Sequence, residues 1–139
     1  MSASDPGIYF KLIEHDRDVL QLVSHNARPG CDTSDWQITI LYYILCLYMK
    51  AFGRVCGREL QDHYSIKQWL NSESRLIPIA RPYRKAEEWS RDARYEGRRF
   101  SSKEVERFLG WFKFVRQHVA GLLSTAGITN LPNIDSVEQ

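Results

Sequence analysis

The sequence predicts an all-α protein, an up-and-down bundle of four to five helices. Two observations support this fold class. Apolar residues recur at helical spacing in long blocks separated by Gly, Pro and Asn, and no run of alternating β-branched residues is bounded by hairpin turns. A chain of 139 residues with 43% hydrophobic residues can form one core. We therefore expect a single domain over 1–139, with its core at about 8–124 and a loose tail after Gly127.

The first helix is expected over 8–26, because an Arg-Pro-Gly run at 28–30 ends the block. Its apolar stripe consists of Ile8, Leu12, Val19 and Val23. The second helix is expected over 36–53, with Ser34 or Thr33 as its N-cap and Asp35 near its positive end. Its stripe consists of Trp36, Ile40, Tyr43, Leu47 and Ala51. Because its other sides are also apolar, this helix belongs in the centre of the bundle.

Two further helices are expected over 63–70 and 82–96. The third starts at His63 or Tyr64. Its inward residues are Ile66, Trp69 and Leu70. The fourth starts near Pro82, because proline is tolerated in a first helical turn, and it ends at Gly97. Its inward residues are Tyr83, Ala86 or Glu87, Ser90 and Ala93, with Trp89 beside them.

The fifth helix is expected over 102–124 and opens with a capping box formed by Ser101 and Glu104. Its stripe consists of Val105, Phe108, Leu109, Phe112, Val115, Val119 and Leu122. Trp111 and Phe114 lie off this stripe. Because interfaces favour large aromatic residues, these two predict a homodimer interface. The alternative is that neighbouring helices of the same chain bury this helix on two sides.

The composition bounds the chemistry and the location of the protein. Three cysteines without a CxxC pair are not typical of a disulfide framework or a zinc site, so we expect reduced thiols, no metal and no cofactor. The N-terminus lacks a basic stretch followed by an apolar one, and the longest apolar run, 40–49, is too short to span a bilayer. We expect a soluble cytoplasmic protein with no membrane partner.

The charge is unevenly distributed along the chain. Between Arg75 and Arg116 there are twelve Lys or Arg and six Asp or Glu, a net charge of +6, whereas the rest of the chain carries −4. Arginine presents a planar fork suited to phosphate, so this asymmetry is compatible with a nucleic-acid or nucleotide partner. An ordinary solvated helix face explains it equally well.

A set of short motifs carries a family resemblance. Tyr42-Tyr43 lie in an apolar helix, Asp62-His63 follow after a short loop, and Arg-Asp-Ala-Arg-Tyr at 91–95 lies late in the next long helix. This order and spacing resembles the HEPN domains of prokaryotes. The resemblance covers about 36–95, and it implies a four- or five-helix bundle that is frequently a homodimer.

The resemblance also implies a range of functions. The superfamily includes RNA-cutting toxins, CRISPR-associated nucleases, nucleotide-binding partners of nucleotidyltransferases, and members without known activity. Two functions are therefore expected as alternatives. The first is a non-catalytic, homodimeric HEPN-like module. Its partner is a nucleotide, RNA, or a protein of the nucleotidyltransferase type. The second is a metal-independent, toxin-like ribonuclease.

The catalytic candidates for the ribonuclease are His63 and Arg58. The nuclease signature of the superfamily is an arginine followed after four to six residues by a histidine, which acts on a 2′-hydroxyl while arginine stabilises phosphoryl charge. Arg58 and His63 form one such match, and about one is expected by chance in a chain of this composition. The structural alternative is that His63 caps the third helix or bonds a backbone carbonyl, with Asp62 or Asp92 holding its tautomer.

A polar cleft beside His63 is the second candidate site. Its expected residues are Tyr43, Asp62, Arg91, Asp92, Arg94 and Tyr95. Asp92 with Arg91 or Arg94 forms either an interhelical ion pair or one wall of this cleft. Tyr43 and Tyr95 are expected to be core aromatics whose hydroxyl groups find partners.

Overall fold

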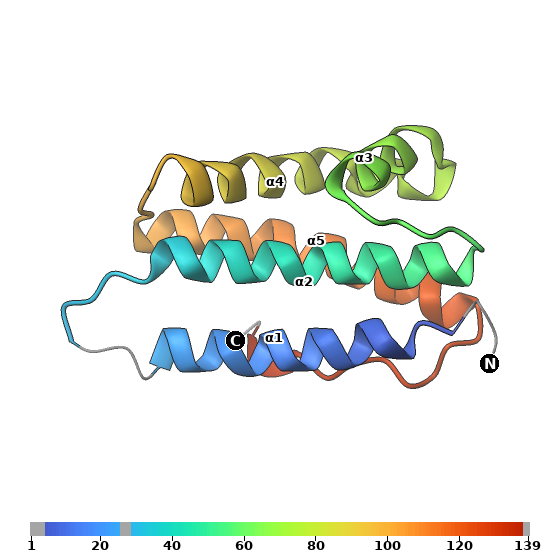
Figure 1. Cartoon of the computed structure of the whole chain (residues 1–139), viewed down its shortest axis with the longest axis horizontal. Helices are drawn as coiled ribbons and strands as arrows, with labels where there is room; N and C mark the ends of the chain where they lie inside the picture. Colours follow the sequence, from blue (N-terminus) through green and yellow to red (C-terminus); the bar gives the residue numbers. More distant parts are fainter. Residues whose placement is uncertain (1–4, 26–28, 138–139) are drawn as a thin grey trace.

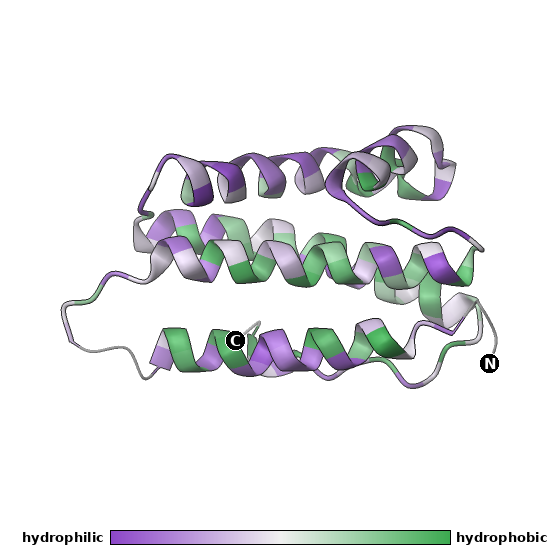
Figure 2. Ribbon diagram, in the orientation of Figure 1, coloured by the Kyte–Doolittle hydropathy of each residue, from purple (hydrophilic) through white to green (hydrophobic). Residues whose placement is uncertain are grey.

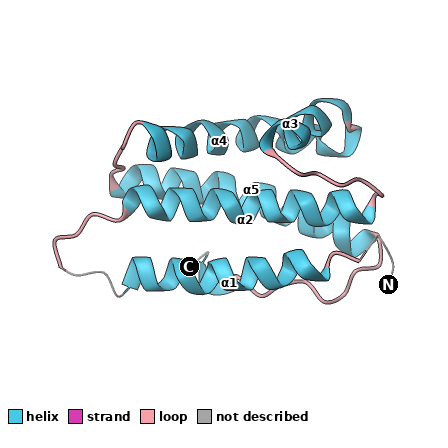
Figure 3. Ribbon diagram, viewed as in Figure 1, coloured by secondary structure: helices cyan, strands magenta, loops and turns pink. Residues whose placement is uncertain are grey.

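The computed structural model describes residues 5–25 and 29–137, and these residues form an all-α bundle (Figures 1 and 3). The α-helices are α1 (Gly7–His25), α2 (Ser34–Val55), α3 (His63–Ser72), α4 (Ala80–Tyr95) and α5 (Ser102–Thr125). Two 3-10 helices, η1 (Ser74–Ile79) and η2 (Asp135–Val137), complete the described elements. No strand is present over 5–25 and 29–137. The predicted fold class is confirmed.

The four long helices run up and down, and α3 is seen almost end-on in Figure 1. Helix α2 lies in the centre and contacts each of the other four α-helices. Its most apolar window is 72% buried, so α2 occupies the place of a core helix although its length and composition would also suit a membrane span. Figure 2 shows α2 as largely hydrophobic and α4 as hydrophilic on its outer side.

Local chemistry explains where the helices begin. Ser101 and Glu104 form the expected capping box at the start of α5. Helix α4 begins at Ala80 rather than near Pro82, because the 3-10 turn η1, which contains Pro78, leads directly into it. Pro82 then falls in the first turn of α4, where no intrahelical partner for a backbone N–H is lost.

The apolar stripes of α1 and α2 are turned relative to the prediction. On α1 the buried residues are Phe10, Ile13 and Leu20, whereas Ile8 and Leu12 are exposed. On α2, Trp36 is 60% exposed and Tyr43 is 38% exposed. Each of these helices has a second apolar side, so periodicity alone does not identify the side that faces the core.

The tail after Gly127, which we expected to be loose, packs along α1 as far as Val137. Ile134 is 1% exposed, and Val137 is also buried. Arg17 donates a hydrogen bond to the carbonyl oxygen of Asn133 at 2.6 Å, and Gln21 donates one to the Ser136 hydroxyl at 2.7 Å. Apolar residues at 131, 134 and 137 recur every third position, and this spacing gives the tail one side that can dock on the bundle.

Candidate functional site

The position of His63 is set by the loop between α2 and α3. Leu60 is buried against Gly53, where an added Cβ atom would lie 2.7 Å from a methyl group of Leu60. Asp62 then caps α3, because its carboxylate accepts from the backbone N–H of Ser65 at 2.8 Å while the Ser65 side chain pairs with the backbone of Asp62. This backbone hydrogen bond lowers the pKa of Asp62. His63 is therefore the first residue of α3 and is not its cap.

The His63 imidazole is bonded to a buried side chain of α2. Its Nδ1 atom lies 3.0 Å from the hydroxyl oxygen of Tyr42, and the two rings stack with centroids 5.5 Å apart. We expected Asp62 or Asp92 to hold the tautomer of His63, but neither does. Asp62 caps α3, and Asp92 pairs with Arg98 at 2.9 Å. The partner of His63 is a tyrosine hydroxyl instead.

The Tyr42 hydroxyl belongs to a longer hydrogen-bonded chain. The Tyr83 hydroxyl donates to Tyr42 at 3.5 Å, and the Cys46 thiol lies 3.5 Å from the Tyr83 hydroxyl and 3.8 Å from Nδ1 of His63. If each hydroxyl donates once, the proton of Tyr42 points to Nδ1 of His63. The imidazole then carries its own proton on Nε2, the nitrogen that does not face the chain.

Burial keeps the members of this chain in their neutral forms. It raises the pKa of Tyr42, of Tyr83 and of the Cys46 thiol, so all three stay protonated at neutral pH. Burial also lowers the pKa of His63, and the positive charges of Arg94 and Lys50 lower it further, against Glu87 and Asp62. At neutral pH the imidazole is uncharged and accepts from Tyr42.

Arg94 lies above three tyrosine rings at the junction of α2 and α4. Its guanidinium carbon is 5.7 Å from the ring centroids of Tyr42 and Tyr43 and 5.2 Å from that of Tyr95. Its Nε atom donates to the carbonyl oxygen of Ser90 at 3.2 Å. Among the residues that the structure describes, no carboxylate pairs with Arg94 or with Lys50. We call the charged side chains of Lys50 and Arg94, together with the uncharged imidazole of His63 between them in chain order, the cationic rim.

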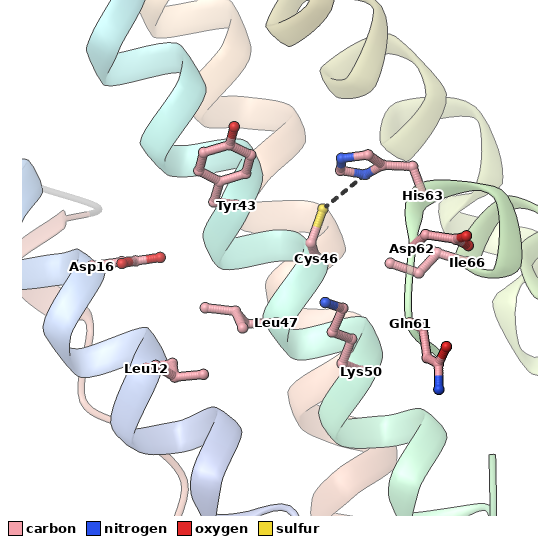
Figure 4. Close-up of a pocket in the computed structure, with 10 residues that line it drawn as sticks. All are labelled: Leu12, Asp16, Tyr43, Cys46, Leu47, Lys50, Gln61, Asp62, His63 and Ile66. Carbon is pink, nitrogen blue, oxygen red and sulfur yellow. Dashed lines mark hydrogen bonds between the residues drawn. The ribbon is translucent and has the colours of Figure 1, made fainter. Parts of the chain in front are cut away.

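A cleft of about 310 Å³ opens next to the cationic rim, between α1, α2 and α3 (Figure 4). We call it the His63 cleft. Its lining residues are Leu12, Asp16, Tyr43, Cys46, Leu47, Lys50, Gln61, Asp62, His63 and Ile66. Its volume lies at the lower end of the range for small-molecule sites, and it combines apolar walls with a few polar groups in the same way.

The structure brings only some of the expected cleft residues together. Tyr43, Asp62 and His63 line the His63 cleft, and Arg94 lies beside it. Arg91, Asp92 and Tyr95 line a separate charged depression on the outer side of α4 and α3. Asp92 does form an ion pair, but its partner is Arg98, which also bonds Glu104 at 2.7 Å.

Tyr43 and Tyr95 are not core aromatics. Tyr95 is 74% exposed, and Tyr43 lies at the surface of the cleft. The buried tyrosines of this region are Tyr42 and Tyr83. The prediction that Tyr43 and Tyr95 lie in the core was wrong. The rotation of α2 about its axis places Tyr42 inside the bundle and Tyr43 outside.

Arg58 and His63 line two different depressions. The guanidinium of Arg58 lies 5.8 Å from the ring centroid of Trp69, and Arg58 lines a hollow with Tyr64 and Gln68. His63 lines the cleft on the side of α1 and α2.

The two aromatic residues predicted for a dimer interface differ in exposure. Trp111 packs within the chain, with its ring centroid 4.8 Å from that of Trp89, as the two-sided burial of α5 predicts. Phe114 is 53% exposed. The homodimer stays a prediction, and Phe114 is the residue on which it depends.

Sequence reasoning missed four residues of the site, namely Asp16, Tyr42, Cys46 and Lys50. The last three recur at i, i+4 and i+8, so they share one side of α2, and this polar spacing in an apolar helix was the available signal. Asp16 interrupts the apolar stripe of α1 between Leu12 and Val19. An acid at such a position points to a polar cavity or an interface.

Over 5–25 and 29–137 no three His, Cys, Asp or Glu side chains are grouped in a way that could hold a metal ion. Comparison with protein-family models, with curated proteins and with solved structures gives no match. A function for this chain is therefore inferred from the geometry of the His63 cleft and its cationic rim.

Proposed function

We propose that this chain is a non-catalytic, HEPN-like helical module that binds a nucleotide, either free or within RNA, at the His63 cleft. The observation that carries the proposal is the cationic rim. Three nitrogen groups from three different helices lie around one concave surface, and two of them have no carboxylate partner among the described residues. Cationic side chains of this kind bind phosphate, and aromatic side chains beside them stack on bases.

The tautomer of His63 supports an anion at this place. Because Tyr42 donates to Nδ1, the outward Nε2 atom carries a proton and can donate to a phosphate oxygen even when the imidazole is uncharged. Arg94 is held by the three tyrosine rings and by the Ser90 carbonyl, so little side-chain entropy remains to be lost when a phosphate binds. Asp62 stays ionised, because the cap hydrogen bond lowers its pKa, and its carboxylate is bonded to the backbone N–H of Ser65 at the start of α3.

The exposed tyrosines supply the aromatic part of the surface. Tyr43 borders the cleft and Tyr95 stands beside Arg94, both with one ring face near a guanidinium. Alternation of tyrosine with arginine is typical of surfaces that bind single-stranded nucleic acid. The ribonuclease alternative would require Arg58 beside His63, and Arg58 lies over Trp69 instead.

Binding of a short labelled oligoribonucleotide at low and moderate salt tests the proposal. Arg94→Gln should weaken binding about tenfold, which is the loss of one charge-assisted hydrogen bond. Arg81→Gln is the matched control, because Arg81 is an exposed arginine of the same helix and lies about 20 Å away along the helix axis. It should leave the affinity nearly unchanged.

The proposal fails if neither RNA nor a mononucleotide binds at low salt, or if the two arginine variants bind equally well. Affinity that does not fall as salt rises would also contradict it, because phosphate binding releases counterions. The same RNA, incubated with EDTA and the wild-type protein, should remain intact. Cleavage that His63→Ala removes would favour the ribonuclease instead.

We also propose that the module is a homodimer through the outer face of α5. The exposed ring of Phe114 supports this proposal, since aromatic residues are enriched at interfaces relative to the rest of a protein surface. Light scattering should give a dimer for the wild type and a monomer for Phe114→Ser. A wild-type monomer at all concentrations tested would refute it.

A further inference from the structure

Asp16 stands on the wall of the His63 cleft that faces the cationic rim. It is partly buried on α1, and Figure 4 shows its carboxylate directed from α1 toward α2, on the opposite side of the cleft from His63. Among the described residues no hydrogen bond or ion pair engages this carboxylate, whereas Asp18, two residues further along α1, pairs with Arg17 at 3.0 Å. Burial raises the pKa of Asp16, against the nearby charge of His15.

The charges of the cleft are separated between its two sides. Lys50 acts electrostatically on His63 and on Asp62, whereas the charge that acts on Asp16 is that of His15. The α1 wall therefore carries the carboxylate of Asp16, and the opposite side carries the charge of Lys50 and the carboxylate of Asp62, with Arg94 beside the cleft. Each of the three helices adds an apolar side chain to the lining, Leu12 from α1, Leu47 from α2 and Ile66 from α3 (Figure 4).

This arrangement selects for a ligand with three parts. It needs an anion at the cationic rim, a flat apolar body between the walls, and hydrogen-bond donors that reach Asp16. A carboxylate with both oxygens free accepts best from two parallel N–H groups. Guanine has such a pair, the N1–H and the N2 amino group, on its Watson–Crick edge. On the same edge adenine, cytosine and uracil each place an acceptor beside a donor, and this acceptor would face a carboxylate oxygen.

We infer that the His63 cleft selects a guanine nucleotide and that Asp16 is its base-recognition residue. This inference rests on the proposed function, because it places the phosphate of the nucleotide at the cationic rim and its base against Asp16. With the wrong base, one oxygen of this partly desolvated carboxylate faces an acceptor instead of a donor, so the discrimination should be substantial. The ligand can be a free guanine nucleotide or a guanosine residue of RNA, and both present the same two donors.

The test compares GMP, IMP and AMP by calorimetry with the full chain at low salt. The wild type should prefer GMP to AMP at least tenfold, and IMP, which lacks the N2 amino group, should fall between them. Asp16→Asn keeps the size of the side chain and should lower the affinity for GMP about tenfold without lowering that for AMP, because the amide can also donate to the acceptor of adenine. Asp18→Asn removes the same charge on the same helix outside the cleft and should change neither affinity.

The outcomes separate this inference from the proposed function. Equal binding of all three nucleotides, with no effect of Asp16→Asn, overturns the role of Asp16 and leaves nucleotide binding in place. The inference and the proposed function are both supported if Arg94→Gln weakens the binding of every nucleotide whereas Asp16→Asn weakens the binding of GMP alone. If no nucleotide binds, the test compares an oligoribonucleotide that contains a single guanosine with the same oligoribonucleotide that contains adenosine there. A preference for guanosine that Asp16→Asn removes supports the inference for RNA. The absence of that preference overturns the inference.

Discussion

Replacing Tyr42 by Phe should destabilise the fold, whereas the same change at Tyr43 should not. The hydroxyl of Tyr42 bonds Nδ1 of His63 at 3.0 Å and accepts from the buried hydroxyl of Tyr83. Tyr42→Phe therefore removes one hydrogen bond and leaves a buried donor with only the Cys46 thiol as a neighbour. A lost hydrogen bond is worth about 1 kcal/mol, and a buried group left without its partner costs about 1–3 kcal/mol.

We expect Tyr42→Phe to lower the free energy of unfolding by about 2 kcal/mol. With a urea m-value of about 2 kcal/mol/M for a chain of this size, the midpoint should shift by about 1 M. Tyr43→Phe removes the same atom from the adjacent residue, whose side chain is 38% exposed, and its effect should stay within about 0.5 kcal/mol. Urea denaturation followed by far-UV circular dichroism measures both values.

The same pair of variants tests the hydrogen-bonded chain directly. In the wild type, nitrogen-detected NMR of the histidines should show the Nε2–H tautomer of His63, and Tyr42→Phe should allow both tautomers. The chain of hydrogen bonds is refuted if the two phenylalanine variants unfold at the same urea concentration and His63 keeps one tautomer in both. Loss of stability without a change of tautomer would show that the hydroxyl of Tyr42 contributes through its bond with Tyr83 rather than through His63.

Three further outcomes follow from single contacts. Ser101→Ala removes the cap of α5 and should cost about 1 kcal/mol by urea denaturation, whereas the neighbouring Ser102→Ala should cost almost nothing; equal losses would refute the cap. Ile134→Ala opens a cavity under the tail and should lower the free energy of unfolding by about 2 kcal/mol. If the tail undocks locally instead, hydrogen-exchange protection should be lost in the tail alone. A variant that behaves like the wild type in both measurements would show that the tail does not dock. Because folding lowers the pKa of His63, the unfolded chain binds more protons than the folded chain below about pH 6.5, so the free energy of unfolding should fall on acidification. The affinity for RNA should rise over the same pH range, because His63 gains a charge while the phosphodiesters of RNA do not titrate there. A flat pH profile of both quantities would contradict the environment of His63.

Much of the fold could be predicted because several local signals agreed. The capping box of α5 and the inward residues of α3 and α4 lie where the sequence predicts them. The docking of the tail was not predicted. Its three docking residues are spread over a short segment between polar residues, so no helical block marked it, and its burial depends on the surface that α1 offers.

The site was harder to predict than the fold, for a physical reason that concerns α2. A helix that is apolar on all sides has no polar face that fixes its rotation, so the sequence does not tell which of the paired tyrosines points inward. The predicted stripe includes Tyr43, whereas Tyr42 is the residue bonded to His63. Asp16 could not be assigned to the cleft either, because that requires knowing which part of α1 lies opposite Lys50.

His63 connects the stability of the bundle with the proposed binding site, and two substitutions can separate these roles. In His63→Asn the amide oxygen occupies the place of Nδ1 and can still accept from Tyr42, but the outward donor is lost. In His63→Gln the longer side chain can present an amide N–H near the place of Nε2, but the acceptor for Tyr42 is lost.

His63→Asn should therefore keep most of the stability and lose affinity for the nucleotide, whereas His63→Gln should lose stability and keep more of the affinity. Urea denaturation and calorimetry on the two variants measure both quantities under the same conditions. If both variants lose stability and affinity in proportion, the cleft depends on His63 only through folding, and the imidazole is not a ligand of the phosphate. If neither quantity changes in either variant, the inward and outward hydrogen bonds of His63 contribute to neither role.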